Sequence, residues 1–161
     1  MSLVGGPIYQ ICWVVEDMDA SVQWFTDTLG VPRWMRMDNI HFGPETCIYR
    51  DEPADFVIDL AIGYAGEQQV ELIKPVSGKS IYADHIAEHG AGMHHVAFSL
   101  DDFEATVADA RARGVTISQS GRLGGMKFAY VDGSAVGASY IELMWMPPEM
   151  HAMFESLKDE Q

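Results

Sequence analysis

Four polar side chains interrupt the most apolar segments of the chain, and their types are those of metal ligands. Gln10 opens QICWVV, Glu71 lies in QVELI, His95 opens HVAFSL and Glu142 lies in YIELMW. Two carboxylate oxygens, one imidazole nitrogen and one amide oxygen form a mixed set that suits Zn, Ni, Co, Mn or Fe(II). The two carboxylates would neutralise a divalent ion and leave coordination positions for water or substrate.

The two glutamates are costly to bury. An unpaired carboxylate in a core is strongly unfavourable unless it is protonated, paired or bound to a cation. In an alternating strand Val70 and Leu72 point one way and Glu71 the other, so either glutamate alone also fits the solvent-facing side of a one-sided sheet. The pair fits that alternative less well, because an internal repeat places Glu71 and Glu142 at corresponding points.

This repeat relates all four residues. The matching segments are 10–16 with 95–101, 16–31 with 101–115, and 70–75 with 141–147. Gln10 therefore corresponds to His95 in the opening strands, and Glu71 to Glu142 in the closing strands. If the halves are pseudo-symmetric, the two glutamates face one another.

Each repeat predicts a βαβββ module, so the fold class is a duplicated α+β domain. The two module helices begin at acidic N-cap candidates and end at Gly30 and Gly114. The strands expected after these helices are 32–37, 46–50, 56–63 and 68–74 in the first half, and 116–120, 126–131 and 138–145 in the second. The expected organisation is a single domain over 1–161, with a first module at 7–75, a linker helix at 76–91, a second module at 92–147 and a C-terminal helix at 148–161.

The net charge, hydropathy and cysteine content of the chain exclude several classes of binding partner and location. The chain has 161 residues with 24 acidic and 10 basic side chains, a formal charge of −14, which argues against nucleic acid and anionic membranes. No apolar run approaches the roughly 20 residues that span a bilayer. The start MSLVGG lacks the pattern of a signal peptide, and Cys12 and Cys47 are too few for a disulfide framework, so a cytoplasmic protein is expected, with both cysteines as core residues.

The motifs QICWVVEDMDASVQWFTDTLGV, GEQQVELIKPVSG, GMHHVAFSLDDFEATVADARARGV and KFAYVD…GASYIELMW together extend over residues 7–147. This pattern resembles the vicinal oxygen chelate superfamily, which includes glyoxalase I, methylmalonyl-CoA epimerase, bleomycin-resistance proteins and extradiol dioxygenases. The resemblance is strongest to the epimerase and glyoxalase-like lyases. It implies a curved mixed sheet that forms a cup.

The resemblance also implies one divalent metal ion held by Gln10, Glu71, His95 and Glu142. Gln10 departs from the His that many members carry at this position, but glyoxalase I is similar in using a Gln, Glu, His, Glu set. Consecutive strand residues face opposite sides, so only one of His94 and His95 is expected to point into the cup, and the correspondence with Gln10 selects His95. The remaining histidines are predicted to be surface residues: His41, His85, His89 and His151.

A metal-dependent lyase, isomerase or epimerase acting on a carbonyl or thioester is the predicted function. The metal would polarise the substrate, and Glu142 in the first place or Glu71 in the second would move the adjacent proton. The alternative is a non-catalytic protein that binds a drug or metabolite in the same cup. A ring-cleaving dioxygenase is the third possibility, disfavoured because the set holds one His rather than two.

Substrate and assembly are less constrained by the sequence. Aromatic and methionine side chains in 33–49 and in the second half are candidates for the core or for an apolar pocket. A CoA or glutathione substrate would need local cations, whose candidates are Arg33, Arg36, Arg50, Lys79, Arg122 and Lys127. A homodimer is the expected assembly.

Overall fold

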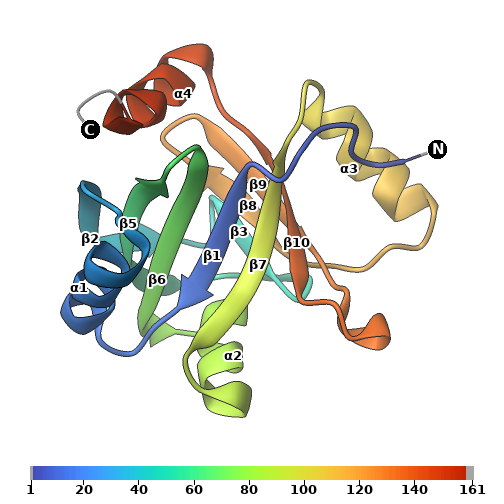
Figure 1. Ribbon diagram of the computed structural model, residues 1–161. Coiled ribbons are helices and arrows are strands. Elements are labelled where there is room, and N and C mark those ends of the chain that lie inside the picture. Colours follow the sequence, from blue (N-terminus) through green and yellow to red (C-terminus); the bar gives the residue numbers. More distant parts are fainter. Residues whose placement is uncertain (1, 159–161) are drawn as a thin grey trace.

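The protein folds around one strongly curved ten-stranded sheet, described by a computed structural model over residues 2–158 (Figure 1). Its strand order is β2-β5-β6-β1-β7-β10-β9-β8-β3-β4. The β1/β6 and β7/β10 pairs are parallel, and the other neighbours are antiparallel. The predicted α+β, glyoxalase-like cup is confirmed.

Two similar sets of elements form the two sides of the cup. The first contains β1 (Gln10–Val14), α1 (Met18–Leu29), β2 (Trp34–Phe42), β5 (Phe56–Ala65) and β6 (Gln68–Gly78). The second contains β7 (Gly92–Ser99), α3 (Phe103–Ala112), β8 (Ile117–Leu123), β9 (Met126–Val131) and β10 (Tyr140–Trp145). A short 3₁₀ helix, Ser134–Val136, connects β9 to β10.

The module helices begin at acidic caps, as the sequence indicates, and α1 ends at the expected Gly30, whereas α3 ends with Arg113 as its cap, one residue before the expected Gly114. Asp17 caps α1 by accepting from the Ala20 amide, and Asp102 caps α3 by accepting from the Ala105 amide. Gly30 follows α1 with φ 69°, in the left-handed region that favours glycine. Beyond these modules, α2 (Ile81–His89) connects the halves, and α4 (Pro148–Glu155) continues into a 3₁₀ turn, Ser156–Lys158. Residues 159–161 of the expected C-terminal helix lie outside the described residues.

One strand lies away from the position that the sequence predicts. The segment expected at 46–50 forms β3 (Cys47–Tyr49), which pairs with β8 of the second half and with β4 (Glu52–Pro53). Gly121 permits this pairing, because a Cβ at that position would lie 2.8 Å from the Thr46 carbonyl oxygen. The first set thus contributes an edge to the opposite side of the cup.

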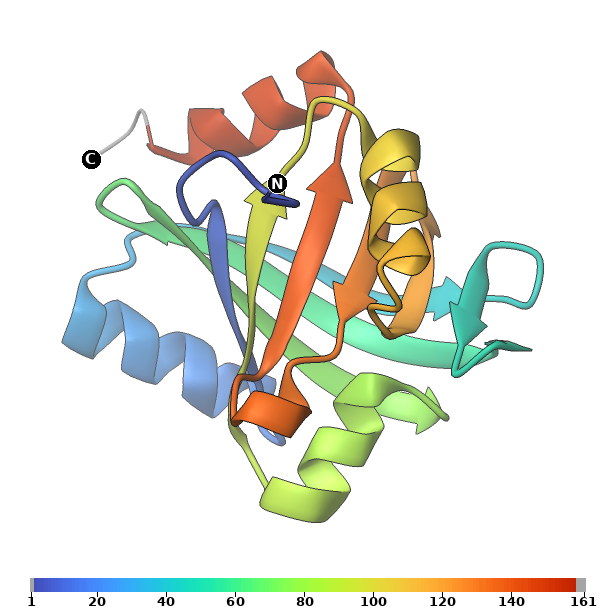
Figure 2. The same cartoon turned by 90° about the vertical axis from the view of Figure 1, so that its right-hand side faces the viewer.

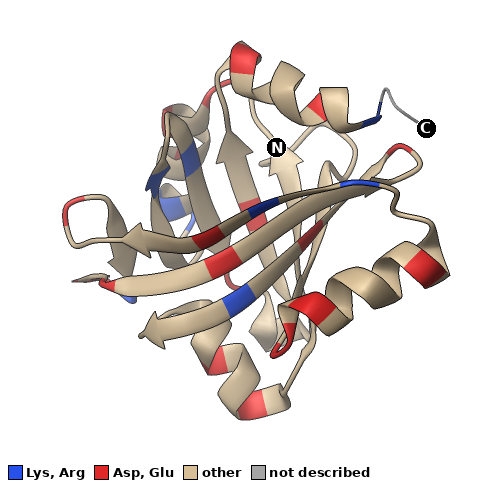
Figure 3. Ribbon diagram, turned by 90° about the vertical axis from the view of Figure 1, so that its left-hand side faces the viewer, with Lys and Arg blue, Asp and Glu red and all other residues tan. Residues whose placement is uncertain are grey.

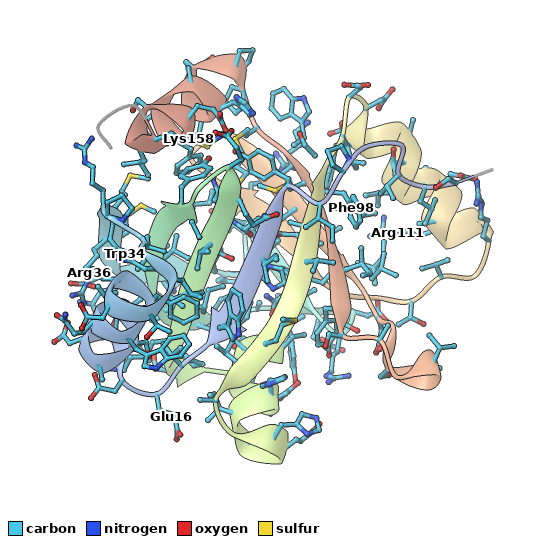
Figure 4. The ribbon with its side chains drawn as sticks, in the orientation of Figure 1. Glu16, Trp34, Arg36, Phe98, Arg111 and Lys158 are labelled. Atoms are coloured by element: carbon cyan, nitrogen blue, oxygen red, sulfur yellow. The ribbon has the colours of Figure 1, made fainter. Side chains whose placement is uncertain are left out.

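Both faces of the sheet are covered where the predicted site lies. On the outer face, Phe25 of α1 packs in one buried cluster with Val70 and Leu72 of β6. Figure 4 shows Trp34 beside α1 and Phe98 toward α3, the helix of the second half. Glu71 and Glu142 alternate with such residues and point inward, with 8% and 3% of their surfaces exposed. The alternative of a one-sided sheet with solvated glutamates does not apply.

Charged groups are spread over the outside of the molecule. Acidic side chains outnumber basic ones on the face that carries α1, β2 and β5 (Figure 3). Within residues 2–158, no helix is both long and apolar enough to cross a membrane.

Candidate metal centre

Four neighbouring strands at the centre of the sheet, β6, β1, β7 and β10, carry the four predicted site residues. Gln10, Glu71, His95 and Glu142 are all buried. The strand registers repeat: they pair Cys12 with Glu71 and His95, and Ala97 with Glu142 and Gln10. This is the pairing expected if Gln10 corresponds to His95 and Glu71 to Glu142.

His95 lies between the two carboxylates. Its Nε2 is 3.4 Å from Glu71 Oε2 and 3.2 Å from Glu142 Oε2. Burial lowers the pKa of His95, but the two glutamates outweigh burial and raise that pKa to about 9. Burial also raises the pKa of Glu142, an effect that His95 opposes. In the metal-free protein a proton on His95 therefore stabilises the two carboxylates.

A β-bulge brings the neighbouring histidine into contact with His95. Cys12 is opposite His95 and Trp13 is opposite Met93, so His94 is the extra residue of β7 and strict alternation fails there. Both His94 and His95 are fully buried, and their Nδ1 atoms are 2.9 Å apart. Strict alternation did not predict this contact, but of the two histidines only His95 lies against the carboxylates of Glu71 and Glu142.

Hydrogen bonds determine which ring nitrogen of His95 faces the site. His94 Nε2 lies 3.3 Å from the Ile81 carbonyl oxygen, which can only accept, so His94 Nε2 donates. Burial, together with His95, lowers the pKa of His94 to about 2, so its Nδ1 is unprotonated and accepts from His95 Nδ1. This arrangement holds His95 with Nε2 toward the carboxylates, as a buried partner orients a ligating histidine.

Gln10 is oriented by a second chain of hydrogen bonds. Its Nε2 donates to Gln69 Oε1 at 2.6 Å, and Gln69 Nε2 donates to the Tyr64 hydroxyl at 2.8 Å. The amide oxygen of Gln10 is consequently left as the free acceptor. Neither His94 nor Gln69 is among the predicted site residues, although Gln69 could have been noted as the polar neighbour two residues before Glu71.

Three members of the set present buried polar atoms without a hydrogen-bond partner. They are Gln10 Oε1, Glu71 Oε2 and His95 Nε2; in the described chain only Gln119 Nε2 of β8 shares this property. Glu71 Oε2 and His95 Nε2 lie 3.4 Å apart, within reach of an ion pair but without the geometry of a hydrogen bond. Buried polar atoms are nearly always hydrogen-bonded, so a cluster of such atoms indicates a missing ligand. Oxygen and imidazole donors with two carboxylates are chemically suited to a divalent cation.

Cys12 extends this cluster in a way that the sequence did not single out. Its Sγ and the ligand atoms of Glu71 and His95 all lie within 4.8 Å of one another. Burial, and next the charge of Glu71, raise the pKa of the Cys12 thiol well above its usual range. Cys12 is part of the buried core, as expected, but it also lies on the inward side of β1, two residues after Gln10.

An apolar cavity of about 290 Å³ opens next to the cluster. Gln10, Gln69, Glu71 and Glu142 line its polar end, and side chains of β2, β5, β8, β9, β10 and α4 form its walls. Figure 2 shows α4 lying across the upper end of the curved sheet. The carboxylates can thus meet a small molecule that is largely shielded from water.

Among the other histidines, His41 and His89 are exposed, as predicted, whereas His85 and His151 are half-buried. The His85 ring packs edge-to-face against the His94 ring, with centroids 5.3 Å apart. None of these four lines the cavity.

Solved structures with the same fold include several epimerases. Methylmalonyl-CoA epimerase from Mycobacterium tuberculosis is 22% identical, with 94% of each chain covered and a TM-score of 0.64. A hypothetical protein from Bacillus halodurans is 18% identical over 88% of this chain and 94% of that one, with a TM-score of 0.67. A variant of the Streptomyces coelicolor epimerase, in complex with 2-nitronate-propionyl-CoA, is 20% identical over 91% and 97%, with a TM-score of 0.59. At these identities the likeness establishes the fold.

A comparison with curated proteins finds no match. The family model described as Glyoxalase/Bleomycin resistance protein/Dioxygenase superfamily matches residues 9–130, which is more than half of the chain. That segment contains β1, β6 and β7 and three of the four clustered residues. The protein therefore belongs to the glyoxalase/bleomycin resistance protein/dioxygenase superfamily.

Proposed function

We propose that the protein is a divalent-metal-dependent lyase, isomerase or epimerase that moves a proton next to a carbonyl or thioester group. The observation that carries the proposal is the cluster of unpartnered donor atoms on Gln10, Glu71 and His95 at the polar end of an apolar cavity. Together with Glu142 these residues would hold the ion. A bound divalent cation acts as a Lewis acid on substrate oxygens and makes a neighbouring C–H bond more acidic.

Proton transfer itself is assigned to the carboxylates. Glu142 is the first choice for the base because burial raises its pKa, which makes the carboxylate a stronger base near neutral pH. Glu71 lines the same cavity and its Oε2 has no hydrogen-bond partner, so Glu71 is the second choice for the base. With both carboxylates near His95, one can take a proton from carbon and the other can return it.

The remaining residues keep the donors in place. His94 holds the His95 ring by its Nδ1, and Gln69 holds the Gln10 amide by its Oε1. The apolar walls exclude water from the reacting carbon, which strengthens electrostatic interactions with the carboxylates.

Two alternative functions would use the same cavity. A binding protein without catalysis is favoured by the enclosed apolar walls and needs no metal. A ring-cleaving dioxygenase is disfavoured because both ring nitrogens of His94 are engaged, by His95 and Ile81, and the cluster among residues 2–158 contains no second histidine ligand. The homodimer and the cytoplasmic location stay predictions.

The test is hydrogen exchange by metal-reconstituted protein in deuterated water. Carbonyl compounds, acyl-CoAs and α-keto hemithioacetals are screened by NMR for deuterium at the carbon next to the carbonyl. We expect metal-dependent exchange that is retained by Glu16→Gln, a control on an exposed carboxylate (Figure 4). Metal binding without exchange of any of these compounds would favour the binding protein, and absence of metal binding would contradict the proposal.

A further inference from the structure

The walls of the cavity indicate the size and polarity of the substrate, which the candidate metal ligands do not. Apolar side chains from six elements, β2, β5, β8, β9, β10 and α4, surround the space beside Glu71 and Glu142. Representative wall residues are Met37 of β2, Leu60 of β5, Met126 of β9, Met144 of β10, and Met153 and Phe154 of α4. Polar groups occur only at the end where the carboxylates lie.

No lysine or arginine is among the described residues that line this cavity. Two lysines near the cavity in the chain are paired with carboxylates instead: Lys158, just after α4, lies 2.7 Å from Glu155 and 3.0 Å from Glu67, and Lys127, which follows the wall residue Met126, is paired with Glu104 of α3. A phosphate or carboxylate on the part of a ligand that packs against the walls would therefore be buried among apolar side chains without a lysine or arginine partner.

The C-terminal helix makes the cavity compact. Phe154 of α4 is buried in the core that fills the cup, and the Tyr64 hydroxyl donates to Glu155 at 3.1 Å, which attaches α4 to β5. The resulting volume is about 290 Å³. Because an apolar cavity of about 150 Å³ holds a benzene molecule, this space suits a group of about twelve non-hydrogen atoms.

We propose, on the basis of the proposed function, that the substrate is a compact, uncharged carbonyl compound that carries an aryl or branched alkyl group. Its oxygen atoms face the polar end of the cavity, and its apolar group packs against Met126, Met153 and Phe154. The class excludes acyl-CoAs and glutathione adducts, because each contains far more than the roughly twelve non-hydrogen atoms that a cavity of about 290 Å³ can enclose.

The test compares chelating ligands that differ only in the group opposite the chelating oxygens. Cobalt-reconstituted protein is titrated with acetohydroxamate, benzohydroxamate and 4-carboxybenzohydroxamate, and binding is followed by the visible spectrum of cobalt and by calorimetry. Burial of the phenyl ring should make benzohydroxamate bind about 10- to 100-fold more tightly than acetohydroxamate. The added carboxylate should remove this gain.

Matched variants locate the site of binding. Met153→Glu places a carboxylate in the wall at a residue that is 47% exposed, and it should weaken benzohydroxamate severalfold without affecting acetohydroxamate. Leu29→Glu on α1 changes an equally exposed residue outside the cavity and should alter neither affinity. Equal binding of all three hydroxamates, or tightest binding of the carboxylated one, would overturn the inference.

Failure of the metal site gives a different result. If cobalt does not bind, the proposed function fails, and acetophenone and 4-acetylbenzoate are compared by calorimetry on the metal-free protein. Preference for acetophenone that Met153→Glu removes would still support the substrate class. Absence of that preference would contradict it.

Discussion

The β1/β6 side of the cup and the β7/β10 side use the same strand pairing to hold different donors. On the first side the Gln10 amide is oriented by another amide, Gln69. On the second side the His95 ring is oriented by His94 through a bulge. One duplicated backbone thus provides a neutral oxygen from one half and a basic nitrogen from the other, and the difference depends on the residue beside each donor.

The two carboxylates also have different neighbours. Glu71 is paired in register with Cys12, whereas Glu142 is paired with Ala97, the residue that corresponds to Cys12 in the repeat. Glu142 is the more deeply buried of the two. The two halves therefore share a backbone pattern but differ in the residues that surround each carboxylate. Substitutions can make these surroundings more alike or more different.

The largest expected effect separates the two carboxylates. Glu142→Gln should lower the rate of substrate deuterium exchange by about 10³-fold, because it removes the base, and Glu71→Gln should lower it by about 10²-fold. The rates are measured by NMR with metal-saturated protein, with Glu16→Gln as the control. Equal losses of rate would mean that Glu71 and Glu142 do not differ in their roles in proton transfer. Full activity of Glu142→Gln would remove that residue from the mechanism.

The next effect concerns the stability of the metal-free protein. His95→Ala leaves Glu71 and Glu142 buried without their basic partner and should cost about 3–5 kcal/mol. Gln10→Ala leaves only Gln69 Oε1 without a donor and should cost about 1–3 kcal/mol. Urea unfolding at pH 6 compares the two variants. A smaller loss for His95→Ala than for Gln10→Ala would contradict the assigned charges.

The same comparison has a pH dependence with a defined sign. The folded-state pKa of His95, about 9, lies above its value of about 6.5 in an unfolded chain. The stabilisation by protonated His95 is therefore complete below about pH 6.5 and is lost as the pH rises through 9. We expect the stability gap between the wild type and His95→Ala to narrow over this range, whereas the Gln10→Ala gap stays constant.

A smaller effect tests the contact that the bulge creates. His94→Phe removes the acceptor for His95 Nδ1 and should weaken metal affinity by about 10- to 100-fold, as loss of other second-layer partners does. His85→Phe is the control, because the His85 ring packs edge-to-face against His94 but makes no hydrogen bond to His95. His94→Gln retains a side-chain acceptor and should recover part of the affinity. Equal affinities for all three variants would make His94 a packing residue only.

The smallest effect makes the two halves more alike. Cys12→Ala gives β1 the residue that β7 carries at Ala97, and the lost sulfur contacts should cost about 1–2 kcal/mol of stability. Metal affinity should stay unchanged, because the buried thiol keeps its proton. A loss of affinity of about tenfold or more would instead make Cys12 a ligand.

Much of the fold was predictable because local signals and the repeat agree. Asp17, Asp102 and Gly30 mark helix ends by their own capping chemistry, and the alternation around Glu71 places it on the face opposite Val70. Correspondence between the halves brought all four site residues to neighbouring strands, although whether they bind metal stays a prediction.

The features that the sequence did not predict depend on contacts between segments that are far apart in the chain. The pairing of β3 with β8 requires close approach to Gly121, which no local pattern reveals. A bulge at His94 changes a strand by one residue, so strict alternation could not anticipate the contact of His94 with His95. The apolar cavity forms only when α4 packs over the open end of the cup. The methionines of α4 indicate an apolar helix face, but they do not indicate which part of the sheet that face covers.

Metal stoichiometry tests the central claim most directly. Wild-type protein and two double variants are dialysed against Zn²⁺ or Co²⁺, and bound metal is measured by elemental analysis. The double variants are Glu71→Gln with Glu142→Gln, and, as the control, Glu16→Gln with Glu149→Gln. We expect one metal ion per chain in the wild type and the control and none in the first double variant. Absence of metal from the wild type, or equal metal in all three proteins, would contradict the account.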